Sequence, residues 1–351
     1  MDIYVLNGLN GISDIISAYR SSIWNVQYFG QGDFQLILDA SAKNLDILKP
    51  GTYLVREEDV TSSGFKNVMV IQNYKLDYNI ESGWLLTLTG KSLKSDLLKR
   101  RIVWSQTNLE NYNVVTGIRD VITNNIINPS DNKRKINNFL LDSAQQIQDT
   151  FTTQLFGENI ADWVEEICTS YELGWDVYIY NGKYYFNVYK GEERENVIFC
   201  SEYDNLLSSS YDYNLDIYQT TALIGGEGAG TNQIIESVGD NYQGLNRYET
   251  YVDGSSVSSN GEIITETTYR NMLKEYGKTQ INQTAFTESF TGEIDYNGLF
   301  KLNQDFFLGD VVKIKNEKGI TANSRIIEII YATDENGTSI VPTFSNWEVN
   351  N

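Results

Sequence analysis

The sequence contains no histidine, and only 3 of its 351 residues are proline and 2 are cysteine. The lack of histidine excludes Ser-His-Asp triads, most zinc sites and the usual general base near neutral pH. Two cysteines cannot form a disulfide framework, and three prolines argue against long disordered linkers. No run of about 18 apolar residues is present, so we expect no membrane anchor.

The N-terminus, "MDIYVLNGLN", carries an acid where an export signal needs basic residues. We therefore expect synthesis in the cytoplasm of a bacterial host. The formal net charge of −20 argues against a protein that grips nucleic acid, which normally presents a basic surface. An acidic wall would instead repel phosphate, so DNA could pass it without binding. Simple solubility is the alternative explanation of the charge.

The composition favours strands, because 13% of the residues are aromatic and 24 of them are tyrosine. Alternating apolar residues and glycine turns recur through the first hundred residues, as in "GDFQLILDAS". Chains of this length usually divide into domains of about 100–150 residues. We predict a first small β-barrel domain over residues 1–100.

Residues 101–200 combine helical and strand patterns and predict an α+β domain with two helices and a hairpin. Asn113 precedes a helical apolar face, and Asn159 precedes a second one that includes Cys168. Gly174 is the expected end of the second helix. Asn181-Gly182, between alternating aromatic and aliphatic residues, predicts a tight hairpin turn.

Residues 201–351 return to a β pattern and predict a second β-barrel domain with an inserted helix near 265–277 that ends at Gly277. Its segment "LGDVVKIKNEKGITANSRIIEII" resembles the upstream "LKPGTYLVREEDVTSSGFKNVMVIQNY" in the order of its strands and turns. We expect residues 48–90 and 308–345 to form equivalent strands of two similar domains. The predicted fold class is therefore α+β, predominantly β: two similar small barrels and an inserted α+β domain, assembling as a ring.

No motif predicts a catalytic, cofactor or metal site. "GGEGAG" lacks the Lys-Ser/Thr of a phosphate-binding loop and a following helix. "DYNLD" begins like a calcium loop but lacks the later glycine and acidic ligand. The one candidate interaction surface is the basic stretch "KSLKSDLLKRR", a contact for an acidic partner or a neighbouring subunit, or else a solvated helix face. Its cations are Lys91, Lys94, Lys99, Arg100 and Arg101.

A series of phrases spread over nearly the whole chain resembles the tail-hub family of siphoviruses, which is akin to the baseplate hub of contractile tails. The phrases include "GDFQLILDASAKNLDILKPGTYLVREED", "RRIVWSQTN", "VITNNIINPSD", "ALIGGEGAG", "YVDGSS" and "FFLGDVVKIKNEKGITANSRIIEII". The resemblance implies a homotrimer without catalytic residues or cofactors, located at the virion tail tip. It also implies distal tail or tail tube proteins, the tape measure and tip or fibre proteins as partners.

Three functions are open at this point. The first is a structural hub whose trimeric ring adapts a six-fold tail tube to a three-fold tip and lines the channel for DNA, which passes without specific binding. The second is a glycan- or receptor-binding module that uses tyrosine and tryptophan as stacking platforms. The third is a carboxylate glycosidase acting on the cell wall, with candidate acids Glu165-Glu166 and Glu192, Glu193 and Glu195.

Overall fold

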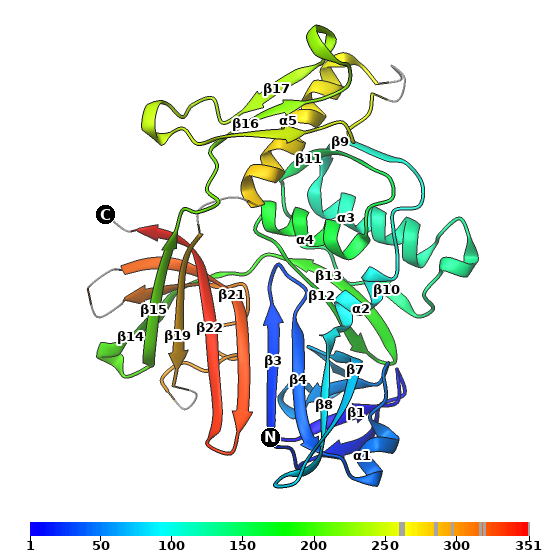
Figure 1. Ribbon diagram of the computed structural model, residues 1–351, viewed down its shortest axis with the longest axis vertical. Helices are drawn as coiled ribbons and strands as arrows, with labels where there is room; N and C mark the ends of the chain where they lie inside the picture. The colour runs from blue at the N-terminus through cyan, green and yellow to red at the C-terminus, as the bar shows by residue number, and fades with distance from the viewer. Residues whose placement is uncertain (260–263, 284–286, 296–297, 316–317, 319–320, 350–351) are drawn as a thin grey trace.

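The structure, a computed structural model, describes residues 1–259, 264–283, 287–295, 298–315, 318 and 321–349 (Figure 1). It is predominantly β, as predicted. None of the helices within these ranges is both long and apolar enough to cross a membrane.

The N-terminal part, which we call the first β unit, consists of strands and two short helical segments. They are β1 (Ile3–Leu6), β2 (Ile12–Ile16), β3 (Ser21–Gln27), β4 (Asp33–Asp39), α1 (Ala42–Ile47), β5 (Tyr53–Arg56), η1 (Glu57–Asp59), β6 (Gly64–Phe65), β7 (Met69–Asn79) and β8 (Gly83–Ser92). One face of β4 and β8 is buried and the other is partly exposed, because apolar and polar residues alternate along both strands.

The middle region joins helices to a four-stranded sheet. Its elements are α2 (Leu93–Lys99), β9 (Thr107–Asn113), α3 (Val114–Ile122), η2 (Thr123–Ile127), η3 (Asn132–Arg134), β10 (Phe139–Leu141), β11 (Thr150–Leu155), α4 (Ile160–Ser170), β12 (Gly174–Tyr180) and β13 (Lys183–Tyr189). Asn113 and Asn159 accept the cap hydrogen bonds of α3 and α4, as predicted. The predicted hairpin is confirmed by the pairing of Tyr180 with Lys183. Gly174 begins β12, and α4 already ends at Ser170.

The C-terminal part contains the second β unit and an insert. The unit comprises β14 (Glu193–Cys200), β15 (Leu206–Asn214), β19 (Thr287–Ile294), β20 (Val311–Lys315), β21 (Thr321–Asp334) and β22 (Gly337–Val349). Short helical segments η4 (Ser201–Tyr203), η5 (Gly230–Asn232) and η6 (Gly244–Asn246) occur in this part of the chain. The insert comprises β16 (Thr221–Gly225), β17 (Ile235–Val238), β18 (Glu249–Asp253) and α5 (Glu266–Gln283).

The inserted helix does not end at Gly277, as predicted, but continues to Gln283. Gly277 lies in the helix because it packs against the insert's sheet: a Cβ there would come within 2.5 Å of Ile224. The glycine thus permits a close approach instead of terminating the helix.

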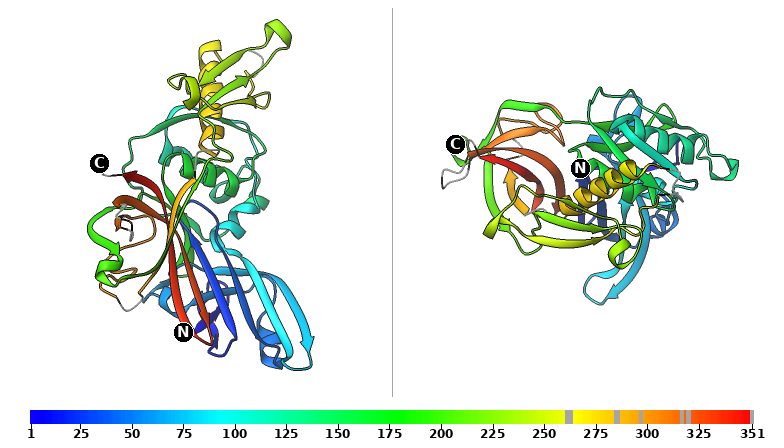
Figure 2. Two further views of the ribbon diagram at one scale, coloured as in Figure 1. Left: turned by 60° about the vertical axis from the view of Figure 1, so that its left-hand side comes forward. Right: turned by 90° about the horizontal axis from the view of Figure 1, so that it is seen from above.

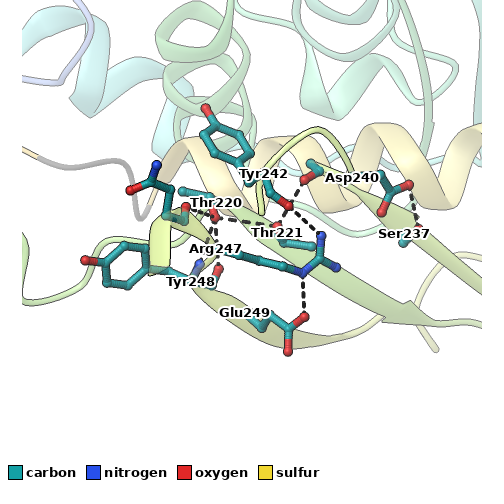
Figure 3. A network of polar contacts seen from close by, with 10 residues as sticks. Thr220, Thr221, Ser237, Asp240, Tyr242, Arg247, Tyr248 and Glu249 are labelled. Carbon is teal, nitrogen blue, oxygen red and sulfur yellow. Dashed lines mark hydrogen bonds and ion pairs between the residues drawn. The ribbon is translucent and has the colours of Figure 1, made fainter. Parts of the chain in front are cut away.

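Polar contacts hold the ends of the insert's sheet together (Figure 3). Thr220 Oγ1 accepts from Tyr248 N–H at 2.9 Å, and Thr221 Oγ1 donates to the carbonyl of Gly239 at 3.1 Å.

The two β units belong to one sheet of 13 strands. Its order is β15-β19-β22-β21-β3-β4-β8-β7-β5-β1-β2, with β20 and β14 branching from β21. The units meet where β3 pairs with β21. The prediction of two barrels is corrected here, because among the described strands no pairing closes either unit. Strand β3 pairs outward with the second unit, so its edge is not available to close the first.

Both units nevertheless follow one order of pairing. In the first unit it is β3-β4-β8-β7-β5-β1, and in the second β15-β19-β22-β21-β20-β14. Strands that take the same place in these two orders also occur in the same succession along the chain, which is β1, β3, β4, β5, β7, β8 in the first unit and β14, β15, β19, β20, β21, β22 in the second. The sequence resemblance thus corresponds to a structural repeat.

The repeat extends to single hydrogen bonds. Gly51 N–H donates to Ile71 O at 2.7 Å, and Gly309 N–H donates to Ile326 O at 2.8 Å. Both glycines have φ near +90°, at 90° and 94°, a conformation that side-chain-bearing residues rarely adopt. The two ladders that follow, β7·β8 and β21·β22, are both irregular directly after these isoleucines. The equivalence of residues 51 and 309, and of 71 and 326, is therefore unambiguous.

The long hairpins β7·β8 and β21·β22 extend toward one end of the molecule, and the insert with α5 occupies the opposite end (Figures 1 and 2). The middle region lies between the insert and the first β unit. Helix α5 packs on β11 and α4 of this region.

Candidate assembly interface

The junction between the two β units is an antiparallel pairing of β3 with β21. It runs over six residue pairs, from Gln27 opposite Glu328 to Ser22 opposite Thr333. The two strands lie side by side at the centre of Figure 1. The junction shows how one β unit is joined edge to edge to another.

The buried face of the junction is aromatic. Trp24 is fully buried and lies opposite Tyr331, which is 3% exposed. The indole Nε1 of Trp24 donates to the carbonyl of Asn67 at 3.1 Å, and its ring centroid lies 5.2 Å from that of Phe34. Trp24 therefore connects strands of the first unit to the strand contributed by the second.

A buried ion pair lies under the same junction. The guanidinium of Arg56 is fully buried, 3.3 Å from the centroid of the Tyr331 ring, and its Nη2 lies 2.6 Å from Oδ2 of Asp59. Asn67 donates to the other carboxylate oxygen at 2.7 Å. Burial raises the pKa of Asp59, and the charge of Arg56 opposes that rise. The pair links the end of β5 to β21, so it belongs to the contact between the units.

The opposite face of the joined strands, which we call the polar face, is partly exposed and carries polar and charged side chains among aliphatic ones. Its charged groups are paired with neighbours on the same face. Gln27 Nε2 donates to Glu328 Oε1 at 3.0 Å, and Lys91 Nζ lies 3.0 Å from Asp33 Oδ2. Thr343 donates to the second oxygen of Glu328 at 2.8 Å. The residues of this face that the structure describes include Ile23, Asn25, Gln27, Asp33, Gln35, Ile37, Thr87, Thr89, Lys91, Glu328, Ile330, Ala332, Val341 and Thr343.

One of the five cations predicted as an interaction surface is buried. Lys94 Nζ donates to the carbonyls of Gln27 at 2.7 Å and Trp175 at 2.9 Å, and lies 4.6 Å from the Trp175 ring centroid. Burial lowers the pKa of Lys94 to about 8, although the nearby Asp176 partly offsets this. This lysine ties α2 to β3 and β12 and is not presented to a partner.

The other four cations lie at or near the surface and are engaged with groups of their own chain. Lys91 pairs with Asp33 as described. Lys99 lies 3.5 Å from Asp162, Arg100 Nη2 lies 2.5 Å from Asp96, and Arg101 Nε donates to the carbonyl of Arg134 at 2.8 Å. The structure does not bring the five together as one patch, and a role of the four in subunit contact stays a prediction.

The candidate glycosidase acids lie in two separate places. Glu165 accepts from Gln31 Nε2 at 2.8 Å. Glu166 lines a cavity of about 110 Å³ between α4 and α5, where burial raises its pKa. Glu192 pairs with Arg194 at 3.0 Å. In the part of the chain that the structure describes, no group of three acids or cysteines could hold a metal ion.

The chain was compared with protein-family models, curated sequences and solved structures. The model of the siphovirus ReqiPepy6 Gp37-like protein family matches residues 2–345. The chain belongs to this family. It is thus a structural protein of the phage tail or baseplate type. A search of curated sequences finds no match.

Three solved structures share the fold of this siphovirus tail protein at low identity. A tail protein from Neisseria meningitidis MC58 has a TM-score of 0.60 and 13% identity, with 98% of this chain and 96% of that chain covered. The 43 kDa tail protein of prophage MuSo2 from Shewanella oneidensis has a TM-score of 0.59 and 13% identity, with 98% of both chains covered. Prophage tail protein gp18 from Listeria monocytogenes EGD-e has a TM-score of 0.54 and 12% identity, with 99% and 94% covered.

Arg56 and Asp59 are central to the junction but were not predicted from the sequence. A signal was present in the strand "YLVR": Arg56 falls on the same alternating face as the buried Leu54. A charge on an apolar face predicts a buried partner, and Asp59 is three residues away. The sequence could not show that Tyr331 covers the pair.

Proposed function

We propose that this tail protein forms the hub ring at the phage tail tip. Three copies assemble into a ring that adapts a six-fold tail tube or distal tail ring to a three-fold tip. DNA passes through the channel without specific binding. The tape measure and the tip or fibre proteins are its further partners, and the hub itself catalyses no reaction.

The observation that carries the proposal is the structural repeat. Two β units with one order of pairing occur in each chain and are joined by β3·β21. Head-to-tail contacts of this kind produce a ring when the rotation between units closes. Three chains then supply six similar units, so a trimer can match a six-fold partner.

The polar face of the joined strands suits the wall of a channel. Asp33 is paired with Lys91, Glu328 accepts hydrogen bonds from Gln27 and Thr343, and the remaining side chains are largely short, polar or aliphatic. The described residues of this face include no cluster of basic groups that could bind phosphate, and the net charge of −20 adds a repulsive field. We therefore place this face toward the channel.

Cryo-electron microscopy of assembled tails tests the proposal, with native mass spectrometry of the purified chain beside it. The expected result is a three-fold ring of this chain at the tail tip, with the β units arranged as six similar wedges. A single copy per tail, or a location along the tail shaft, would contradict the hub.

A further inference from the structure

Strand β7 has an outer edge that its equivalent β21 does not leave open. In the second unit, the outer edge of residues 328–333 is occupied by β3. In the first unit, β5 pairs only with Met69 and Val70. Beyond them, residues 73–79 pair with β8 alone among the described strands. The backbone of this segment is therefore able to accept a further strand.

Strand β15 is the equivalent of β3 and stands at the end of the sheet order. It pairs with β19, and no other described strand lies on its second edge. Among the described strands, these two open edges are therefore of opposite type: the edge of β15 corresponds to that of β3, and the edge of β7 corresponds to that of β21, which β3 joins. Within one chain the same two types of edge already meet in the junction.

The repeat fixes how the open edges would align. Ile71 and Ile326 are equivalent, and the same irregularity of the ladder follows each of them. The fourth residue after each is therefore equivalent, Lys75 to Ile330, and so is the fifth, Leu76 to Tyr331. The pairing of β4 with β8 and of β19 with β22 makes residue 34 equivalent to residue 290. Through the ladders β3·β4 and β15·β19, Asp212 then corresponds to Asn25 and Tyr211 to Trp24.

Exposure differs sharply between the closed junction and the open edges. Trp24 and Tyr331 are 0% and 3% exposed, whereas the equivalent Tyr211 and Leu76 are 39% and 40% exposed. Tyr78, further along β7, is 61% exposed. Apolar side chains that the junction buries inside the chain therefore stay in contact with solvent at the open edges.

Resting on the proposed ring, we infer that β15 of one copy adds antiparallel to the outer edge of β7 in the next copy. The register places Asp212 opposite Lys75 and Tyr211 opposite Leu76. The occupant of each open edge is thus a second copy of this chain. Continuity with the β3·β21 junction supports the inference, and so does the opposite charge of Asp212 and Lys75, which would face each other across the new ladder.

The geometry of the equivalent internal pair makes a cross-link test possible. Tyr28 N–H donates to Ile327 O at 2.8 Å, so Asn25 and Ile330 form a non-hydrogen-bonded pair of the ladder. Cα atoms of such pairs lie about 4.5 Å apart, within the range that a disulfide spans. The native Cys168 and Cys200 are buried and unbridged. They should therefore contribute little background.

The test is oxidation of the full chain carrying Asp212→Cys and Lys75→Cys, in purified protein and in assembled tails. Most of the chain should shift on non-reducing denaturing gels to covalent dimers and trimers. Asn25→Cys with Ile330→Cys is the positive control and should form a bond within one chain. Asp212→Cys with Leu76→Cys places the thiols on opposite faces and should stay monomeric on the gel.

The outcomes separate the register from the ring. A three-fold particle without cross-links in the Asp212/Lys75 variant, or with cross-links in the offset variant, overturns the register and leaves the hub intact. A chain that is monomeric even in assembled tails overturns the hub itself. As a second readout, Lys75→Glu should reduce the trimer fraction at low salt, and adding Asp212→Lys should restore it. Failure of that rescue also counts against the register.

Discussion

The two β units differ most where they do not pair with each other. The first begins with β1, which is antiparallel to β5, whereas the second begins with β14, which is parallel to β20. A short turn joins β3 to β4, but the whole insert with α5 lies between β15 and β19. The inner strands of the two pairing orders recur in both units: β4, β8, β7 and β5 in the first, and β19, β22, β21 and β20 in the second. The hydrogen bond from Gly51 or Gly309 to the equivalent isoleucine also recurs. Shared constraints therefore act on the strands that form the continuous sheet, and peripheral strands and loops vary freely.

The units also differ in what they bury at equivalent positions. Arg56, fully buried in the first unit, corresponds to Ile314 in the second, which is also fully buried. The first unit thus uses an ion pair where its copy uses an aliphatic side chain. A buried ion pair often stabilises no more than well-packed apolar residues do. The following variants test this comparison, from the largest expected effect to the smallest.

Trp24→Ala should lower the free energy of unfolding by about 3–5 kcal/mol, because it empties a fully buried site and removes the bond to Asn67. The equivalent Tyr211→Ala should cost less than about 1 kcal/mol in the isolated chain, since Tyr211 is 39% exposed. Urea unfolding at a concentration where the chain is monomeric measures both. Equal losses in the free energy of unfolding would show that burial in the internal junction does not make Trp24 more stabilising than its equivalent Tyr211.

Arg56→Ala should destabilise by about 3–5 kcal/mol, because Asp59 is left as an unpaired buried acid. The double variant Arg56→Leu with Asp59→Leu should recover most of this loss, since the second unit is already apolar at the equivalent of residue 56. Arg20→Ala is a matched control, because its pair with Asp39 is exposed, and it should cost under about 1 kcal/mol. A double variant as unstable as Arg56→Ala would mean that the ion pair stabilises the fold by more than compensating the burial of its own two charges.

Gly309→Ala and Gly51→Ala alter equivalent glycines in different surroundings. Both positions have positive φ, so each substitution should cost about 1 kcal/mol from the backbone alone. A Cβ at Gly309 would also lie 2.2 Å from the ring of buried Tyr28, whereas nothing lies within 4 Å at Gly51. The loss at Gly309 should therefore reach about 2–4 kcal/mol. Thermal or urea unfolding should show the larger loss of stability for Gly309→Ala. A larger loss for Gly51→Ala would contradict the close packing of Gly309 against Tyr28.

The buried Lys94 predicts a pH dependence of stability. Its pKa is about 8 in the folded chain and about 10.4 when unfolded, so the unfolded chain binds more protons between these values. The free energy of unfolding should therefore rise with pH between about 8 and 10.4, by up to about 1.4 kcal/mol per pH unit. Urea unfolding of the wild type and Lys94→Met from pH 7 to 10 should give diverging curves, with the wild type gaining. Parallel curves would mean that Lys94 titrates normally.

Much of the secondary structure could be predicted from the sequence because the responsible residues act locally. Asn113 and Asn159 cap the helices that they precede, and Asn181-Gly182 forms its turn. Predictions were wrong where a contact with a distant residue changed the structural role of a residue. Gly277 had the pattern of a helix end, but its role is set by Ile224, more than 50 residues away. The cations of "KSLKSDLLKRR" form one group in sequence, yet burial separates Lys94 from the rest.

The sequence by itself determined the predominantly β class, the repeat of a strand pattern and the absence of histidine chemistry. These follow from composition and from periodicities that each strand carries alone. Only the tertiary structure decided that the described strands of the repeated units close no barrel and share one sheet through β3 and β21. The edge of a strand has no sequence signature of its own, because backbone N–H and C=O groups are alike in every residue except proline. Which edges pair, and which stay available to another copy, depends on the packing of side chains such as Trp24 and Tyr331 from opposite ends of the chain.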